Sequence, residues 1–110
     1  MHPRRGEVWW VAFDPSVGGE IQKTRPAVVI SNDSANSALN RVIVVPISSQ
    51  VTKVYPGEAL ITLNGEQRKA MADQIITASK QRLKNKLGIL SRPDVAAVEA
   101  AILLQLAIRR

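Results

Sequence analysis

The sequence predicts a mainly β domain that ends in one α-helix. Short apolar runs rich in valine and isoleucine recur over roughly the first 90 residues, separated by Pro, Gly and Asn turn signals. They do not alternate with helical patterns, which argues against a parallel, doubly wound sheet. A helical pattern with clear start signals follows Ser91. We therefore expect a single domain over residues 1–110, built as a small, strongly curved antiparallel barrel with a C-terminal helix.

The first strand is expected from Gly6 to Phe13, a segment of aromatic and β-branched residues. Trp9 and Trp10 would point to opposite faces of this strand. One should enter the core, and the other should meet a partner, a lid or solvent. For the outer tryptophan we favour a second hydrophobic contact, such as a subunit interface, over base stacking.

A polar loop should connect this strand to a second one at Pro26 to Ser31. The loop contains Glu20 and Lys23, and Arg25 stands at its exit. Solvated charges are the ordinary interpretation of such a loop. The alternative is that the carboxylate and the guanidinium perform chemistry, because loops held by a rigid scaffold often carry functional residues.

The middle of the chain predicts three further strands and their turns. Asp33 or Ser34, in the turn that begins at Asn32, should cap a short helical turn over Ala35–Leu39. The remaining predictions are a third strand over Arg41–Ile47 with Pro46 at a bulge or edge, polar Ser48, Ser49 and Gln50 at its end, a fourth strand over Glu58–Leu63, a hairpin turn at Asn64-Gly65, and a strand over Lys69–Thr77 that contains the polar pair Asp73-Gln74.

The densest basic cluster consists of Lys80, Arg82, Lys84 and Lys86. In a strand all four side chains would share one face, whereas in a helix only Lys80 and Lys84 would align. The cluster is a candidate for phosphate contacts, although a solvated face is the commoner fate of such a run.

The C-terminal helix should begin at Ser91 as N-cap, with Pro93 in its first turn and Leu90 and Val95 spaced as a hydrophobic staple. From Val95 to Ile108 only two residues are polar. A helix that is apolar nearly all round must be buried on more than one side, which predicts a homodimer. The terminal Arg109-Arg110 would suit the helix dipole.

Composition excludes several classes of function. The net charge of +6 favours a polyanionic partner, nucleic acid first. The chain has no cysteine, its single histidine is His2, and it has no phosphate-binding glycine motif and no carboxylate pair with metal-ligand spacing. No apolar stretch is long enough to span a membrane. We expect a cytoplasmic protein without a cofactor or a metal ion.

The remaining polar residues, Glu20, Arg25 and the Ser48-Ser49 hydroxyls, suit cleavage of RNA. RNA carries its own nucleophile, the 2′-hydroxyl, beside the scissile phosphate. Arg25 would stabilise charge on phosphorus, Glu20 would accept the 2′-hydroxyl proton or orient Arg25, and Ser48 would donate to a phosphate oxygen.

Several segments together resemble the MazF/PemK (Kid) toxins, in order and over nearly the whole chain. These segments are Gly6-Glu7-Val8-Trp9, Phe13-Asp14-Pro15, Gly19-Glu20, Arg25-Pro26-Ala27-Val28-Val29-Ile30-Ser31, Val45-Pro46-Ile47-Ser48-Ser49-Gln50, Asp73-Gln74-Ile75 and Lys80-Gln81-Arg82-Leu83. Each is weak alone, and their combination identifies the family.

The resemblance implies an SH3-like barrel, similar to CcdB and PemK, and a homodimer. It also implies metal-independent, sequence-specific cleavage of single-stranded RNA to a 2′,3′-cyclic phosphate, and neutralisation by an acidic antitoxin. By position, Arg25 matches the family's catalytic arginine and Glu20 its loop glutamate. Ser48 matches a position that is commonly threonine, which leaves open whether Ser48 or Ser49 acts. The residues we expect on the RNA path are Lys23, Asn32, Gln50, Gln74, Lys80 and Arg82.

Two alternatives have the same barrel without nuclease chemistry: a gyrase-poison-like interaction protein and a basic barrel that only binds RNA. The combination of Arg25, Glu20 and the serine pair favours the nuclease. A Leu103→Glu change in the apolar helix should destabilise either the fold or the dimer.

Overall fold

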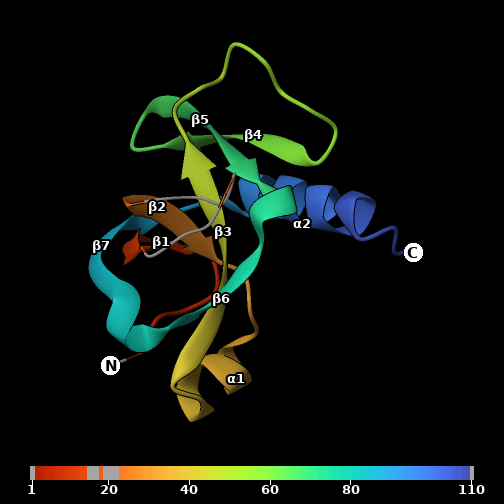
Figure 1. The fold of residues 1–110 in the computed structure, drawn as a ribbon. Coiled ribbons are helices and arrows are strands. Elements are labelled where there is room, and N and C mark those ends of the chain that lie inside the picture. The colour runs from red at the N-terminus through yellow and green to blue at the C-terminus, as the bar shows by residue number, and fades with distance from the viewer. Residues whose placement is uncertain (1, 15–17, 19–22, 110) are drawn as a thin grey trace.

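A computed structural model describes residues 2–14, 18 and 23–109 of the chain. Over these ranges Figure 1 shows a sheet that curls round, with one long helix against it. The elements in chain order are β1 (Glu7–Ala12), β2 (Thr24–Val29), α1 (Asp33–Ala38), β3 (Arg41–Ser48), β4 (Glu58–Leu63), β5 (Glu66–Met71), the 3₁₀ turn η1 (Ala72–Gln74), β6 (Ile76–Ser79), the 3₁₀ turn η2 (Lys80–Arg82), β7 (Leu83–Ile89) and α2 (Arg92–Gln105).

The strands form one sheet in the order β4-β5-β3-β2-β1-β7, with β6 also paired to β3, and the neighbouring strands run antiparallel. The sheet curls so far that the β4–β5 turn contacts β7 at the other end of the strand order. In this contact Asn64 Nδ2 donates to the Leu87 carbonyl at 3.1 Å. The predicted curved antiparallel barrel with a C-terminal helix is confirmed, in the form of a curled half-barrel.

Two apolar clusters occupy the two faces of the central strands. Successive residues of a strand point to opposite faces. Accordingly Val28 belongs to the cluster under α2, while Ala27 and Val29 belong to the other cluster, which includes Val11 and Phe13. Over residues 27–29 and 44–47 both faces of β2 and β3 are buried and the sequence is apolar without alternation, and these rigid segments hold the polar residues next to them.

Helix α2 begins as predicted, since the Ser91 hydroxyl accepts the Asp94 N–H at 3.2 Å. It buries Val98 and Ala101 against the sheet, while Leu104 is 60% exposed. The helix ends at Gln105, and Ala107 has a φ of 57°, typical of a helix C-terminus. The apolar run to Ile108 therefore extends past the helix, and Arg109 lies beyond its last turn and not at its end; Arg110 lies outside the described residues.

Two strand predictions were wrong in their bounds. Strand β2 begins at Thr24, so Arg25 lies inside it and not before it. The strand predicted over Lys69–Thr77 is broken: β5 ends at Met71, and Asp73 and Gln74 lie on η1. The reason is that β3 exchanges its neighbour here, from β6 at Val44 to β5 at Ile47.

Two local predictions also need correction. Pro46 lies opposite Ala27 inside the sheet, at the gap between β6 and β5, and not at an outer edge. The N-cap of α1 is Asn32, whose Oδ1 accepts the Ala35 N–H at 2.8 Å, and not Asp33 or Ser34. The Asn64-Gly65 hairpin is confirmed, with both residues at positive φ as a two-residue turn of this type requires.

In the part of the chain that the structure describes, we find no helix with the length and apolar character needed to cross a membrane.

Candidate functional site

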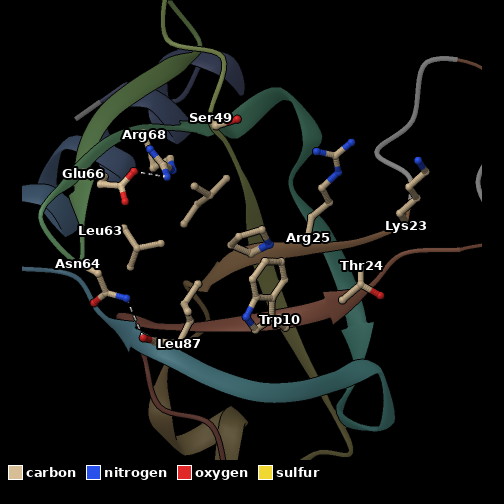
Figure 2. Close-up of a pocket in the computed structure, with 12 residues that line it drawn as sticks. Trp10, Lys23, Thr24, Arg25, Ser49, Leu63, Asn64, Glu66, Arg68 and Leu87 are labelled. Atoms are coloured by element: carbon tan, nitrogen blue, oxygen red, sulfur yellow. Dashed lines mark hydrogen bonds and ion pairs between the residues drawn. The ribbon is translucent and has the colours of Figure 1, made fainter.

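A cavity of about 580 Å³ opens where β1, β2 and the end of β3 face the β4–β5 hairpin. Figure 2 shows Arg25 and Lys23 on one side, Ser49 above, and the hairpin residues on the other side. Its lining consists of Trp10, Lys23, Thr24, Arg25, Pro26, Ile47, Ser49, Leu63, Asn64, Glu66, Arg68 and Leu87. Among these described lining residues three side chains are basic and one is acidic, a balance that suits an anion.

Arg25 is held in β2 opposite Val11, next to the Trp10–Pro26 pair. Its side chain is exposed and extends over the cavity (Figure 2). The proline fixes its own φ and the strand ladder fixes the backbone on both sides, so the guanidinium projects from a rigid base. A charge that stabilises a reacting group needs this kind of fixed origin.

The two serines at the end of β3 have different surroundings. Ser49 is exposed and lines the cavity with Arg25. Ser48 is half-buried, and its Oγ accepts the Gln50 N–H at 3.0 Å, which tightens the turn out of the strand. The structure thus brings Ser49 to the cavity, while Ser48 and the backbone of Gln50 shape the turn beneath it.

The base of the β1–β2 loop is closed by a set of hydrogen bonds. Lys23, at a φ of 63°, donates its N–H to Asp14 Oδ1 at 2.8 Å and accepts the Phe13 N–H at 2.8 Å. Arg82 reaches across from η2 and donates to the carbonyls of Ala12 and Asp14 at 2.9 and 2.7 Å. Glu20, the predicted proton acceptor, lies outside the described residues.

The loop after Ser49 is held from below by a buried ion pair. Lys69 Nζ contacts Glu58 Oε1 at 3.0 Å and donates to the Lys53 carbonyl at 3.0 Å, while Glu58 accepts the Tyr55 N–H at 2.9 Å. The Lys69 and Glu58 side chains are only 9% and 10% exposed. One buried ammonium group therefore fixes the loop that leads out of the serine pair.

The β4–β5 hairpin forms the far wall of the cavity, and sequence reasoning did not find this wall. Arg68 is oriented by bonds to Glu66 Oε2 at 2.8 Å and to the Gln67 carbonyl at 2.9 Å. Gly88 allows the hairpin to approach, because a Cβ there would lie 3.0 Å from Asn64 Oδ1. The Asn-Gly turn signalled the hairpin, but no local signal indicated that it folds back onto β7.

The other predicted RNA-path residues lie elsewhere in the fold. Asn32 caps α1, and Gln74 lies on η1. Lys80 is the first residue of η2, and its backbone N–H donates to the Asn40 carbonyl. These three are not among the residues that line the cavity, and their contact with RNA stays a prediction.

The basic cluster from Lys80 to Lys86 is divided between η2 and β7. Lys86 Nζ pairs with Glu7 at 2.9 Å, and Lys84 Nζ donates to the Gln81 carbonyl at 3.3 Å. Burial raises the pKa of Glu7, but hydrogen bonds from the Arg4 N–H, Lys86 and Trp9 together outweigh it and hold the pKa below its ordinary value. Within the described ranges, no three His, Cys, Asp or Glu side chains gather closely enough to hold a metal ion.

Comparison with known proteins places the chain. Residues 4–106 match the family described as PemK-like, MazF-like toxins of type II toxin–antitoxin systems. The endoribonuclease MazF9 of Mycobacterium tuberculosis is 41% identical, over 94% of this chain and 95% of that protein. The endoribonuclease toxin MazF of Escherichia coli K12 is 35% identical, over 91% of this chain and 90% of that protein.

Solved structures share the fold. A MazF from Deinococcus radiodurans superposes with a TM-score of 0.87 at 24% identity, over 98% of this chain and 99% of that one. A mycobacterial endoribonuclease solved with its cognate antitoxin superposes with a TM-score of 0.83 at 19% identity, over 98% of both chains. The chain therefore belongs to the PemK-like, MazF-like toxins of type II toxin–antitoxin systems.

Proposed function

We propose that this protein cleaves single-stranded RNA at specific sequences without a metal ion, leaving a 2′,3′-cyclic phosphate. The enzyme class follows from its relatives: proteins that are 35–41% identical over nearly the whole chain are endoribonucleases, and this protein is one as well. The two non-enzymatic alternatives have no such support. The single structural observation behind the proposed mechanism is that Arg25 and Ser49 line one basic cavity.

The reaction needs little covalent chemistry from the protein. The 2′-oxygen bonds to phosphorus, the bond from phosphorus to the 5′-oxygen breaks, one proton leaves the 2′-hydroxyl and one joins the 5′-oxygen. Arg25 stabilises the extra negative charge on the phosphoryl oxygens with paired N–H donors. An arginine stays protonated near neutral pH, so its role is electrostatic first.

The Ser49 hydroxyl donates to a phosphate oxygen on the other side of the same cavity, and Ser48 is the alternative donor. Ser48 Oγ already accepts one hydrogen bond from Gln50, yet its own O–H remains able to donate. Separate Ser48→Ala and Ser49→Ala variants distinguish the two, because only the working hydroxyl should lower the cleavage rate. Glu20 remains our proposed proton acceptor.

Lys23 and Arg68 extend positive charge along the cavity, and Lys23 would position the RNA backbone. Arg82 holds the base of the β1–β2 loop, and Gln50, Gln74, Lys80 and Asn32 are further proposed contacts with the RNA. The acidic antitoxin would compete for the same positive surface, and the activity is expected in the cytoplasm with its substrate.

We also propose a homodimer, which would cover the outer side of α2. Leu104 is 60% exposed and Leu106 51% exposed at the end of this helix. Leu103→Glu should lower either the melting temperature or the dimer fraction in analytical ultracentrifugation. Leu104→Glu, at an exposed position, should change only the dimer fraction. A wild-type dimer profile and melting temperature in both variants would contradict the covered helix.

The test of the function is incubation of the purified protein with a long RNA in EDTA. We expect discrete fragments with cyclic phosphate ends, lost in Arg25→Ala. Arg41→Ala is the matched control, because Arg41 is exposed at the other end of β3 from Ser48. Intact RNA at high protein concentration, or equal cleavage by Arg25→Ala, would contradict the proposal.

A further inference from the structure

The cavity has two chemically different ends, and only one of them is needed for a phosphate. Lys23, Arg25 and Ser49 form the charged end. Leu63 and Leu87 give the other end an apolar floor, beside the polar hairpin residues Asn64, Glu66 and Arg68 (Figure 2). A volume of about 580 Å³ is within the range of sites that bind whole small molecules. The apolar end has room for more than the reacting phosphate.

Trp10 stands between the two ends. It is 37% exposed although it is a large aromatic residue on a central strand. In the β1–β2 ladder it faces Pro26, one position from Arg25. Trp9, its neighbour in sequence, is packed against the core and donates its indole N–H to Glu7 at 3.1 Å. Of the two tryptophans, only Trp10 lines the cavity.

The hairpin contributes a polar group above this apolar floor. Two hydrogen bonds to its own strand orient the Arg68 guanidinium, and its side chain is 30% exposed. A guanidinium carries five N–H donors, so these two bonds fix its direction and leave capacity for a ligand. Trp10 and Arg68 lie on facing walls of the same cavity (Figure 2). An aromatic ring and an oriented donor group that face one space are a combination that recognises an unpaired nucleobase.

We propose that the apolar end is a nucleobase subsite, in which Trp10 stacks on a base next to the scissile phosphate and Arg68 reads the acceptor atoms on that base's edge. Asn64 is a positioning residue for this subsite, because its bond to Leu87 holds the hairpin in place. The inference rests on the proposed RNA cleavage and adds the group that selects one base of the target sequence.

The first test measures cleavage of an RNA pool with a randomised segment, with the cut ends sequenced. Trp10→Ala should lower kcat/KM by about 5- to 150-fold, as expected for one stacked base, and Trp10→Phe should keep most of the activity. Arg68→Gln should relax the base preference at one position next to the cut. Trp9→Phe and Arg41→Gln are the matched controls and should change neither quantity.

The second test separates binding from cleavage. The probe is an oligonucleotide that contains the mapped site with a 2′-deoxy residue at the cleaved position, which removes the nucleophile. It should quench the fluorescence of the Trp9→Phe protein, in which Trp10 remains, and not that of Trp10→Phe. Equal quenching of both variants, or an acidic peptide that quenches Trp10 where the RNA does not, would overturn the subsite.

The two proposals fail in different ways. Unchanged rates and base preferences in Trp10→Ala and Arg68→Gln, together with loss of cleavage in Arg25→Ala, would reject the subsite and keep the nuclease. Absence of cleavage by the wild-type protein would reject the nuclease itself.

Discussion

The two loops that border the cavity are both held by a basic side chain from another element, in different environments. Arg82 holds the β1–β2 loop from outside, through the backbone carbonyls of Ala12 and Asp14. Lys69 holds the β3–β4 loop from inside, as a buried ion pair with Glu58. The comparison teaches that positive charge in this chain serves two purposes: some of it builds the site, and some of it lines the cavity in which we propose that RNA binds.

The buried pair should give the largest effect. Removing one partner of a buried ion pair leaves an uncompensated charge and costs about 3–5 kcal/mol. Lys69→Met should therefore lower the free energy of unfolding by about that amount, measured by urea denaturation. A Lys69→Met, Glu58→Leu double variant should recover part of the loss. A loss below about 1 kcal/mol in the single variant would show that the ammonium group does not support the loop.

Arg82→Ala should have an intermediate effect, because hydrogen bonds from a charged donor are worth about 1.5–3 kcal/mol. We expect a lower kcat, from a displaced loop base, with little change in the salt dependence of RNA binding. If Arg82 instead contacts phosphate, as the sequence predicted, the negative slope of log K against log salt should become shallower by about 0.7 in Arg82→Ala. The slope therefore decides between the two roles of this residue.

Lys23→Ala sharpens the comparison from the RNA side. Lys23 lines the cavity, and its contacts with the described residues of the loop base are made by its backbone. Its loss should weaken RNA binding uniformly across sequences and reduce the salt slope by about 0.7, with no change in unfolding free energy. Loss of stability without a change in the salt slope would show that Lys23 supports the fold and does not contact RNA phosphates.

The smallest effect concerns Glu7, whose folded-state pKa lies below its ordinary value of 4.5. A depressed carboxyl pKa stabilises the fold above the unfolded pKa, and this contribution is lost as the pH falls through the folded pKa. The stability of the wild-type protein should therefore decline below about pH 4.5. Glu7→Gln should be less stable near neutral pH and show a flatter decline in acid; a parallel decline would contradict this contribution.

Features that a few neighbouring residues decide could be predicted from the sequence, and features that depend on contacts between distant segments could not. The Asn64-Gly65 turn and the Ser91 cap were predicted correctly, because each is decided by a few neighbouring residues. The break between β5 and β6 was missed, since it arises where β3 changes partners. Arg82 belonged to a basic cluster in sequence, but the carbonyls it binds lie 70 and 68 residues earlier.

The candidate site shows the same limit. Arg25 and the serine pair were predicted as one site from their residue types and from the family resemblance, and Arg25 and Ser49 do line one cavity. The hairpin wall with Arg68 could not be predicted, because it depends on the closure of the sheet. Only that closure brings Asn64 to Leu87.

The central claim is that the RNA supplies its own nucleophile, in a cavity where Arg25 stabilises the negative charge that develops on the phosphate. The most direct measurement compares single-turnover cleavage of a mapped RNA site with that of the same oligonucleotide carrying one 2′-deoxy residue at the cut, both in EDTA. We predict that the RNA is cut to a cyclic phosphate, while the substituted strand binds with similar affinity and stays intact. Cleavage of the substituted strand at the same position would contradict the account.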